Sequence, residues 1–267
     1  MSDPVPEDVS RALSTTAHRR GTFGTPLYFF LEAGSTNDIA ASLAEQGAAQ
    51  GTTVLAGSQT AGRGRFSRIW FSPPGAGLYV SVICRHSRAA PFLTLAGGVA
   101  VADGIRNATG LPVQIKWPND VVVEPDRGPR RKLAGILAEA TSTPEGLQYV
   151  ILGFGINLRS AAYPPELTDR VTSIEVELGR VVDGNVVLAE TLAVLAERCA
   201  QLERGDSAQV LSRWRELSPS CRGAAIEWDT AGGPASGIAA GIDDDGALRV
   251  RVGQQIQRII SGEVRWK

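Results

Sequence analysis

The chain has 267 residues, of which 43% are hydrophobic, so it can bury a sizeable core and is not disordered throughout. Its 27 basic and 28 acidic side chains leave a net charge of −1, which excludes a general electrostatic attraction to nucleic acid or anionic membranes. Glycine accounts for 30 residues, about 11% of the chain against roughly 7% in soluble proteins, and this surplus requires an explanation.

The first residues are acidic, and no stretch has the roughly 18 apolar residues that a membrane helix needs. The three cysteines, Cys84, Cys199 and Cys221, are far apart and form no CxxC pattern. This spacing argues against a disulfide framework or a structural zinc site. We therefore expect a cytoplasmic protein with reduced thiols and no membrane association.

Residues 1–25 have room for at most one short helix, too little for a DNA-binding helix-turn-helix domain. A strand is expected at residues 27–31. A helix is expected at 37–46, opened by a capping box over Ser35-Thr36-Asn37-Asp38 and closed by Gly47. The next expected elements are strands at 52–58 and 77–84 and a helix at 91–109.

Four further strands follow too closely for a helix to fit between them, so antiparallel pairing is expected. They cover residues 113–117, 121–124, 132–140 and 148–156. Two helices at 186–204 and 207–217 then precede four short strands at 224–228, 237–242, 247–252 and 256–260. The pattern predicts an α+β fold with a mixed, largely antiparallel sheet and a small C-terminal β-barrel. The expected domains are an extension (1–25), a main domain (26–218) and the barrel (219–267).

A glycine-rich loop with three arginines follows the strand at 52–58. It contains Arg63, Arg65 and Arg68 among Gly57, Gly62 and Gly64. Glycine lets backbone N–H groups approach an anion, and guanidinium groups neutralise its charge, so the loop is typical of phosphate or carboxylate binding. It matches neither a Walker loop nor a dinucleotide fingerprint. A flexible, solvated loop is the alternative.

Lys116-Trp117-Pro118-Asn119-Asp120 lies between two expected strands, and its proline is unsuited to a central strand. A turn at the end of the sheet is therefore expected. Its lysine, amide and carboxylate could bind the phosphates of a nucleotide and the accompanying Mg²⁺. A turn carrying only a solvated salt bridge is the alternative.

Two later strands contain glycine at interior positions, which destabilises a strand unless something packs closely against it. Gly135 follows Arg131 and Lys132, and Gly153 and Gly155 precede Asn157. A ligand is one possible neighbour of these glycines. A β-bulge or a covering helix is the other.

These motifs together resemble the biotin protein ligases. The resemblance rests on GSTN, QTAGRGR, a tryptophan shortly afterwards, KWPND, RKLAGIL and GFGIN, in this order over residues 27–158, and extends to the C-terminal segment ending in SGEVRW. It implies a catalytic domain of the biotin and lipoate ligase type, similar to class II aminoacyl-tRNA synthetases, with a small SH3-like barrel. It also implies the monofunctional type, without a DNA-binding domain.

The resemblance assigns site residues position by position. Catalytic roles fall to Arg63, Arg65, Lys116 and Lys132. Biotin binding falls to Ser35, Thr36, Asn37, Gln59, Gly62, Arg63, Gly64, Arg65, Lys132, Gly135 and Gly153. ATP binding falls to Arg65, Trp70, Lys116, Asn119, Asp120, Lys132 and Asn157, with Asp120 as a ligand of Mg²⁺.

The reaction implied uses biotin and MgATP to form biotinyl-5′-AMP and then modifies a lysine of a biotin carboxyl carrier protein. The chain departs from the family at Phe66-Ser67, where Arg-Gly is expected. The resemblance also implies a basic residue just past the last strand that faces the ATP phosphates, and Arg265 and Lys267 are the nearest candidates, with neither assigned. A lipoate or octanoate ligase and a non-catalytic biotin- or nucleotide-binding regulator are the alternative functions. No DNA partner is expected, and both a monomer and a homodimer are compatible with the resemblance.

Overall fold

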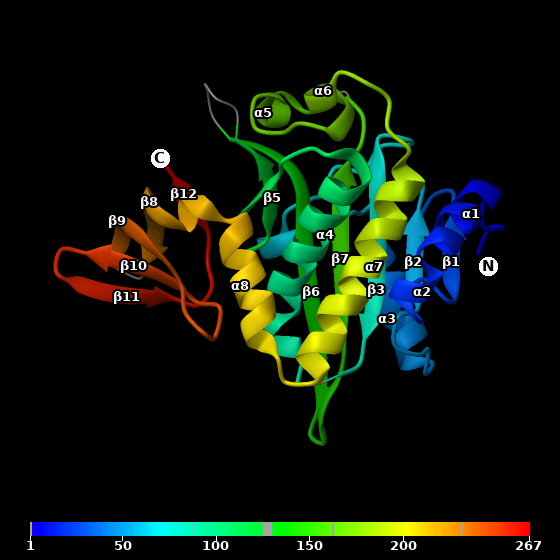
Figure 1. Ribbon diagram of the computed structural model, residues 1–267, viewed down its shortest axis with the longest axis horizontal. Helices are drawn as coiled ribbons and strands as arrows, with labels where there is room; N and C mark the ends of the chain where they lie inside the picture. The colour runs from blue at the N-terminus through cyan, green and yellow to red at the C-terminus, as the bar shows by residue number, and fades with distance from the viewer. Residues whose placement is uncertain (1, 87, 125–129, 162, 231) are drawn as a thin grey trace.

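A seven-stranded sheet forms the centre of the main domain (Figure 1). The computed structural model describes residues 2–86, 88–124, 130–161, 163–230 and 232–267. The strands are β1 (Leu27–Phe30), β2 (Thr53–Ala56), β3 (Gly77–Cys84), β4 (Gln114–Lys116), β5 (Asp120–Val123), β6 (Arg131–Thr143) and β7 (Gly146–Asn157). Their order is β1-β2-β3-β7-β6-β5-β4. Strands β1 and β2 pair in parallel and all other described neighbours are antiparallel, which confirms the predicted mixed sheet.

The two faces of the sheet have different roles. Because side chains alternate along a strand, Leu152 and Phe154 of β7 point into the main hydrophobic core on one face. Ile151 points to the other face and packs with Ala40 and Ala44 of helix α3 (Thr36–Glu45). Further along this second face, β7 presents glycines instead of apolar side chains, so the surface beside α3 is left open.

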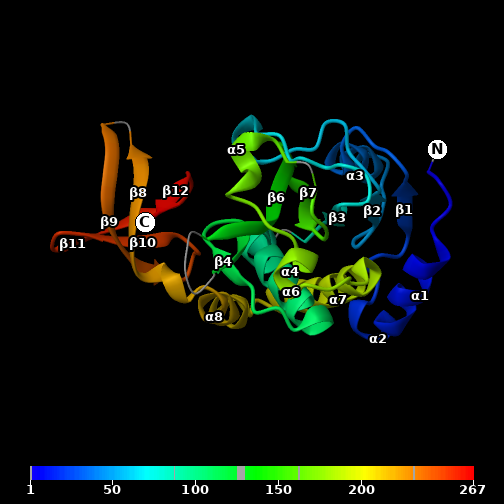
Figure 2. The ribbon, with the colours of Figure 1, turned by 90° about the horizontal axis from the view of Figure 1, so that it is seen from above.

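Three long helices cover the core face (Figures 1 and 2). They are α4 (Leu93–Thr109), α7 (Gly184–Glu203) and α8 (Ser207–Leu217), close to the predicted bounds. Asp183 and Asp206 cap α7 and α8 by accepting from backbone N–H groups of the first turn. The large apolar side chains of α8 are buried, namely those of Val210, Leu211, Trp214 and Leu217.

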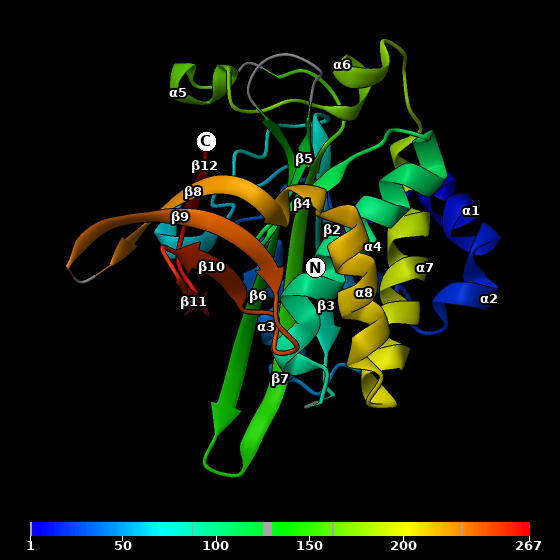
Figure 3. The ribbon, with the colours of Figure 1, turned by 60° about the vertical axis from the view of Figure 1, so that its left-hand side comes forward.

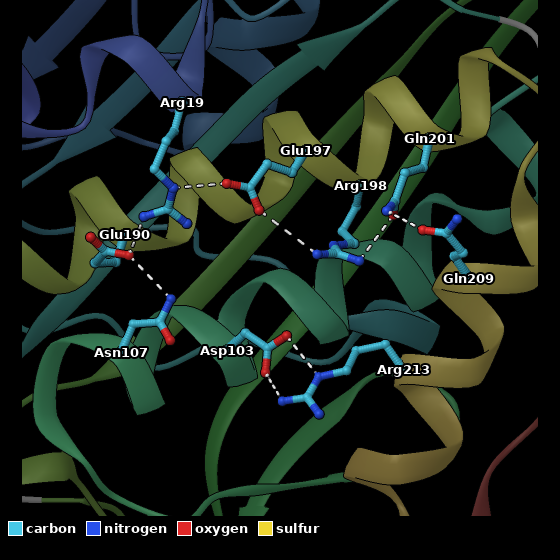
Figure 4. A network of polar contacts seen from close by, with 9 residues as sticks. All are labelled: Arg19, Asp103, Asn107, Glu190, Glu197, Arg198, Gln201, Gln209 and Arg213. Atoms are coloured by element: carbon cyan, nitrogen blue, oxygen red, sulfur yellow. Dashed lines mark hydrogen bonds and ion pairs between the residues drawn. The ribbon is translucent and has the colours of Figure 1, made fainter.

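Polar side chains link these helices on the outside of the core (Figure 4). Asp103 of α4 accepts two hydrogen bonds from Arg213 of α8, over 2.7 and 3.0 Å. Arg19 bonds Glu190 and Glu197 of α7, each over 2.8 Å. The bidentate pair fixes the separation of α4 and α8, and the Arg19 contacts attach the N-terminal segment to α7.

Several local expectations are wrong. Residues 1–25 contain two helices, α1 (Glu7–Thr15) and α2 (Ala17–Arg20), and not at most one. Ser35 is the N-cap of α3, but its side chain makes no capping hydrogen bond, and the Asp38 carboxylate pairs with Arg63. Two short helices, α5 (Pro165–Thr168) and α6 (Ile174–Leu178), were not predicted. They lie at one end of the sheet (Figure 1).

The C-terminal strands form a separate antiparallel sheet (Figure 3). They are β8 (Arg222–Thr230), β9 (Gly233–Ile242), β10 (Leu248–Val252), β11 (Gln255–Ile259) and the unpredicted β12 (Val264–Trp266), in the order β11-β10-β9-β8-β12. The Trp117 indole donates to the Gly246 carbonyl over 3.0 Å and joins this sheet to the main domain. Short 3₁₀ turns lie at Arg65–Ser67, Ala90–Phe92 and Pro219–Cys221. Among the described helices, none is long and apolar enough to cross a membrane.

Candidate functional site

A cavity of about 980 Å³ lies over the open part of the sheet and reaches the C-terminal sheet. Residues expected at the site from the sequence line it: Ser35, Thr36, Asn37, Gln59, Arg63, Gly64, Arg65, Trp70, Lys116, Asn119, Asp120, Lys132, Gly135, Gly153 and Asn157. Gly62 is not part of the lining, because it packs behind the wall: a Cβ there would lie 2.4 Å from the Trp70 carbonyl oxygen. Segments distant in sequence therefore meet at one place.

A β-bulge directs Lys132 into this cavity. Val121 and Val122 of β5 pair with Ala134 and Lys132 of β6, so Leu133 is an extra residue in β6. The insertion reverses the alternation of side chains: Leu133 is fully buried in the core, while Lys132 shares the cavity face with Gly135. Without the bulge Lys132 would point to the opposite face.

The cavity has a charged end beside this bulge. Lys132 Nζ lies 2.6 Å from Asp120 Oδ1, and Arg65 Nη1 lies 3.3 Å from Asn119 Oδ1. Asn119 Nδ2 donates to the Ile136 carbonyl over 2.9 Å, so its oxygen is the atom offered to Arg65. The tight turn between β4 and β5, which contains the cis peptide bond before Pro118, brings these side chains together.

Burial disfavours the protonated, charged form of two cationic side chains at this end of the cavity. It lowers the pKa of the Lys116 ammonium, although the nearby Asp120 carboxylate opposes the shift. Burial likewise lowers the pKa of the Arg65 guanidinium. A charged group that is partly desolvated interacts strongly with an anion, because less water screens the interaction. This end of the cavity is therefore suited to phosphate or carboxylate groups.

The other end of the cavity carries uncharged hydrogen-bonding groups. Gln59 Oε1 accepts from the Thr36 backbone N–H over 2.9 Å and from its hydroxyl over 3.1 Å. Gln59 Nε2 donates to Ser72 Oγ over 2.9 Å. Ser81 Oγ, fully buried on β3, lies 2.8 Å from Thr36 Oγ1 and 2.5 Å from Asn37 Oδ1. We call Thr36, Asn37, Gln59 and Ser81 the polar rim.

Arg63 lies beside the polar rim. Its Nη2 is 2.7 Å from Glu139 Oε2 and 3.0 Å from Asp38 Oδ1. Glu139 is seven residues beyond Lys132 on β6, so the structure separates Arg63 from the cluster of Arg65, Lys116 and Lys132 with which the sequence grouped it. Both carboxylates neutralise Arg63 in this conformation.

Trp70 fills a slot above the glycines of the sheet. Gly135 and Gly155 are paired neighbours on β6 and β7, and Cβ atoms there would lie 2.9 and 2.2 Å from the Trp70 ring. Lys132 Nζ stands 5.1 Å from the centre of the same ring. A Cβ on Gly153 would lie 2.2 Å from Asn37 Oδ1. The neighbours of these glycines are thus side chains of the protein.

The arginine-glycine loop, residues 62–70, also contacts the C-terminal sheet. Phe66 and Ser67, which stand where the family has Arg-Gly, have φ values of 56° and 58°, a left-handed conformation that glycine adopts more readily. Arg68 forms an ion pair with Glu263, and this pairing lowers the pKa of the Glu263 carboxyl. The loop is therefore anchored on both sides of Phe66 and Ser67. Arg65 bonds Asn119 before them, and Arg68 pairs with Glu263 after them.

The chain's last residues complete the wall. Arg265 and Lys267 both line the cavity, where Arg265 pairs with Asp229 over 2.8 Å and Lys267 with Glu227 over 2.5 Å. Asn157, at the end of β7, donates to the Thr172 carbonyl over 3.0 Å. Sequence reasoning missed several lining residues between β7 and α6, namely Tyr163, Leu167, Asp169, Arg170 and Val171. Tyr163 packs against Phe71 with ring centroids 5.8 Å apart.

No group of three or more His, Cys, Asp or Glu side chains able to hold a metal ion occurs in the described part of the chain. Asp120 is the carboxylate nearest the cations of the charged end, and its Oδ1 bonds Lys132. This arrangement agrees with a Mg²⁺ ion held mainly by substrate phosphates and water, which is how proteins usually bind this ion.

Comparison with known proteins gives two family matches. The Biotin/lipoate A/B protein ligase family matches residues 33–157, and the Biotin protein ligase C terminal domain matches residues 229–265. The biotin--[acetyl-CoA-carboxylase] ligase of Mycobacterium tuberculosis is 35% identical over 243 residues, which cover 87% of this chain and 86% of that protein. The ligase of the same name from Paracoccus denitrificans is 36% identical over 83% of this chain and 93% of that protein.

Solved structures agree with the sequence matches. The biotin protein ligase of Aquifex aeolicus in complex with biotin and ATP superposes with a TM-score of 0.77 at 26% identity. The alignment covers 90% of this chain and 99% of that one. It therefore includes both the main domain and the C-terminal sheet.

Proposed function

This chain belongs to the biotin protein ligase family and is a ligase, and from that premise we propose that it activates biotin with ATP and transfers it to a protein lysine. The acceptor that we propose is a biotin carboxyl carrier domain, in line with the names of the relatives. The observation that carries the proposal is one cavity with a cationic end and a polar end. We also assign the reaction to the cytoplasm, since all three cysteines are free and buried.

The reaction has two steps. A biotin carboxylate oxygen attacks the α-phosphorus of ATP, the bond to the β-phosphate oxygen breaks, and pyrophosphate leaves. The acceptor lysine nitrogen then attacks the carbonyl carbon of biotinyl-5′-AMP, AMP leaves, and the amine loses a proton. The enzyme supplies no nucleophile, so its contribution is to position two anions and to stabilise the charge that develops on phosphoryl oxygens.

The cationic end would perform that task. Lys132 and Arg65 would contact the biotin carboxylate and the α-phosphate, and Lys116 would contact the nucleotide phosphates. Lys132 is already held by Asp120 and Arg65 by Asn119, so little reorganisation of these two cations is needed when the anions arrive. In the absence of ligand, Asp120 serves as the counter-ion of Lys132.

The polar rim would bind the ureido ring of biotin. Ser35, Thr36, Asn37 and Gln59 are the residues that we assign to this contact, and Ser35 to Asn37 are buried at the start of α3. A ureido group offers two N–H donors and one carbonyl, and burying them requires partners for all three. Gly64 and Gly153 would let the loop and the sheet approach the ring closely, and Arg63 would close the rim. Gly62 would act indirectly, because it lets the loop pack against the Trp70 backbone behind the wall.

Nucleotide contacts would come from the remaining lining residues. We propose that Trp70 leaves or tilts within its slot over Gly135 and packs against adenine, while Asn119 and Asn157 contact the nucleotide. The Nε1 atom of Trp70 is buried and lacks a hydrogen-bond partner among the described residues, so no protein hydrogen bond of the indole would be lost if the ring moved. When Mg²⁺ accompanies ATP it would balance phosphate charge, and Asp120 would supply one oxygen ligand.

A lipoate or octanoate ligase is the main alternative, because the matching family includes both kinds of enzyme. The polar rim favours biotin. Lipoate carries a dithiolane ring and octanoate an alkyl end, and neither could pair with the buried groups of Thr36 and Gln59. Such a substrate would gain no hydrogen bonds from the rim, whereas the ureido group of biotin offers two N–H donors and a carbonyl. A non-catalytic binding protein would use the same cations to hold biotin or a nucleotide, so only a catalytic assay separates it from an enzyme.

Biotin-dependent exchange of radiolabelled pyrophosphate into ATP tests the proposal. The purified protein with MgATP should exchange pyrophosphate when biotin is added and remain inactive with lipoate or octanoate. Exchange that responds only to lipoate or octanoate would establish the alternative enzyme. Biotin binding without any exchange would indicate a regulator.

A further inference from the structure

We infer that Glu139 is a positioning residue that fixes the direction of the hydrogen bonds in the polar rim, and thereby selects ligands whose head group carries an N–H donor. The inference rests on the proposed function and concerns two residues, Glu139 and Ser81, that the motifs of the sequence do not include. Both lie on the cavity face of the sheet, Ser81 on β3 and Glu139 on β6.

Glu139 determines which way the Asn37 amide points. Asn37 Nδ2 donates to Glu139 Oε2 over 2.5 Å. An ionised carboxylate can only accept, so the amide nitrogen must face Glu139 and the amide oxygen must face Ser81. Packing alone would not select this orientation, because the backbone beneath Asn37 is that of Gly153, which has no side chain to distinguish an oxygen from a nitrogen.

Ser81 transmits this orientation to Thr36. The hydroxyl of Ser81 has a single proton, and Asn37 Oδ1, 2.5 Å away, is an acceptor that needs it. Ser81 Oγ therefore has no proton left to donate to Thr36 Oγ1 and can only accept from it. The Thr36 hydroxyl, 2.8 Å from Ser81 Oγ and 3.1 Å from Gln59 Oε1, must donate to one of these two oxygens. In either case the lone pairs of Thr36 Oγ1 remain available for a ligand N–H.

Reversing the amide would change this outcome. If Asn37 presented its nitrogen to Ser81, Ser81 would accept from it and donate its own proton to Thr36 Oγ1. The Ser81 proton would then occupy one of the two lone pairs of Thr36 Oγ1 and leave a single lone pair for the ligand. The acceptor at position 139 therefore determines how many lone pairs of Thr36 Oγ1 are free to accept a ligand N–H group.

Glu139 also bonds Arg63, so the two contacts must be separated by experiment. Both Asn37 Nδ2 and Arg63 Nη2 bond the same atom, Glu139 Oε2. Asp38 bonds Arg63 over 3.0 Å and has no bond to Asn37 among the described contacts. Glu139→Ala removes the acceptor of both Asn37 and Arg63, whereas Glu139→Gln can keep an oxygen at the same place. Asp38→Ala removes a partner of Arg63 and leaves the contact of Asn37 intact.

The test measures the affinity of the full chain for biotin alone and for ATP alone by calorimetry, with thermal unfolding as a check of folding. We expect Glu139→Ala to weaken biotin binding about tenfold, the effect of losing one charge-assisted hydrogen bond in a partly buried site. Glu139→Gln should stay within about threefold of the wild type, and so should Asp38→Ala. ATP affinity should remain within about twofold in all three variants, because the nucleotide contacts lie at the other end of the cavity.

Several results would overturn the inference. They are unchanged biotin affinity in Glu139→Ala, an equal loss in Glu139→Gln, an equal loss in Asp38→Ala, or a parallel loss of ATP affinity or of folding in Glu139→Ala. If the wild-type chain itself binds no biotin, the proposed function fails and this inference fails with it. Normal wild-type binding together with normal binding in Glu139→Ala contradicts the inference alone.

Discussion

Lys132 Nζ lies 2.6 Å from Asp120 Oδ1, and the contact exists because Leu133 is an extra residue in β6. The bulge moves Leu133 into the core and Lys132 to the cavity face, where it meets a carboxylate from the turn between β4 and β5. Bulges next to active sites commonly redirect a side chain in this way. The packing of one leucine thus places the lysine to which we assign the main catalytic role.

Lys132→Ala should lower the rate of biotin-dependent pyrophosphate exchange by about 100-fold or more, the usual effect of removing a group that stabilises developing charge. The fold should survive, because the Lys132 side chain is 31% exposed and its contact with Asp120 is an ion pair at the cavity surface. Exchange and thermal unfolding measured on the same preparation check this. Wild-type exchange in this variant would refute the role of Lys132.

Arg65→Ala should likewise slow adenylate formation by a factor of about 100, since Arg65 is partly desolvated beside Asn119. Arg68→Ala is the matched control. Arg68 lies in the same loop but pairs with Glu263, and its side chain is 61% exposed. We expect a much smaller effect there, measured as single-turnover formation of biotinyl-5′-AMP. Equal losses in both variants would mean that only the loop's conformation matters.

The exchange rate should decline at alkaline pH because Lys116 loses its charge. Burial lowers the pKa of Lys116, so the ammonium deprotonates at a lower pH than a solvated lysine, and the attraction for phosphate is lost as pH rises through that value. Lys116→Arg should move the decline to higher pH, because a guanidinium stays protonated. The measurement is the pH profile of kcat/KM for ATP. Superimposable profiles would show that another group titrates.

Gly155→Ala should displace the Trp70 ring. A Cβ at this position would lie 2.2 Å from Trp70 Nε1, so the ring must leave its slot, at a cost of about 1–3 kcal/mol in the free energy of unfolding. Tryptophan fluorescence should differ between Gly155→Ala and the wild type. It should not differ between the Trp70→Phe variant and the double variant that carries both Trp70→Phe and Gly155→Ala. Gly34→Ala, where nothing lies within 4 Å of the added Cβ, is the control for unfolding. If Gly155→Ala and Gly34→Ala show the same fluorescence and the same free energy of unfolding, the packing of the Trp70 ring against Gly155 is contradicted.

Most strands and long helices could be predicted from the sequence because local pattern determines them. The apolar run in residues 148–156 and the short gaps between strands are enough to predict β7 and antiparallel pairing. Helices α5 and α6 were missed because they are one or two turns long within a segment rich in proline and polar residues, and their position depends on tertiary contacts such as Arg131 with Glu177.

In the candidate site, too, some residues could be predicted from local sequence pattern, while others depend on tertiary contacts. Motifs with unusual composition, such as the arginine-glycine loop, are visible in the sequence and lie at the cavity. Ser81 and Glu139 were missed because a serine and a glutamate within strands have no distinctive pattern. The bulge at Leu133 is equally invisible, since its register depends on how β5 pairs with β6. The separation of Arg63 from Lys132 also follows from that pairing, and not from their spacing in the sequence.

Intact-mass analysis of a biotin carboxyl carrier fragment tests the central claim most directly. With the purified chain, biotin and MgATP, we predict the addition of one biotinyl group per carrier, located at a single lysine by peptide mapping and absent when ATP is omitted. Lipoate in place of biotin should produce no addition. An unmodified carrier in the presence of biotin, together with a carrier modified by lipoate, would contradict the account.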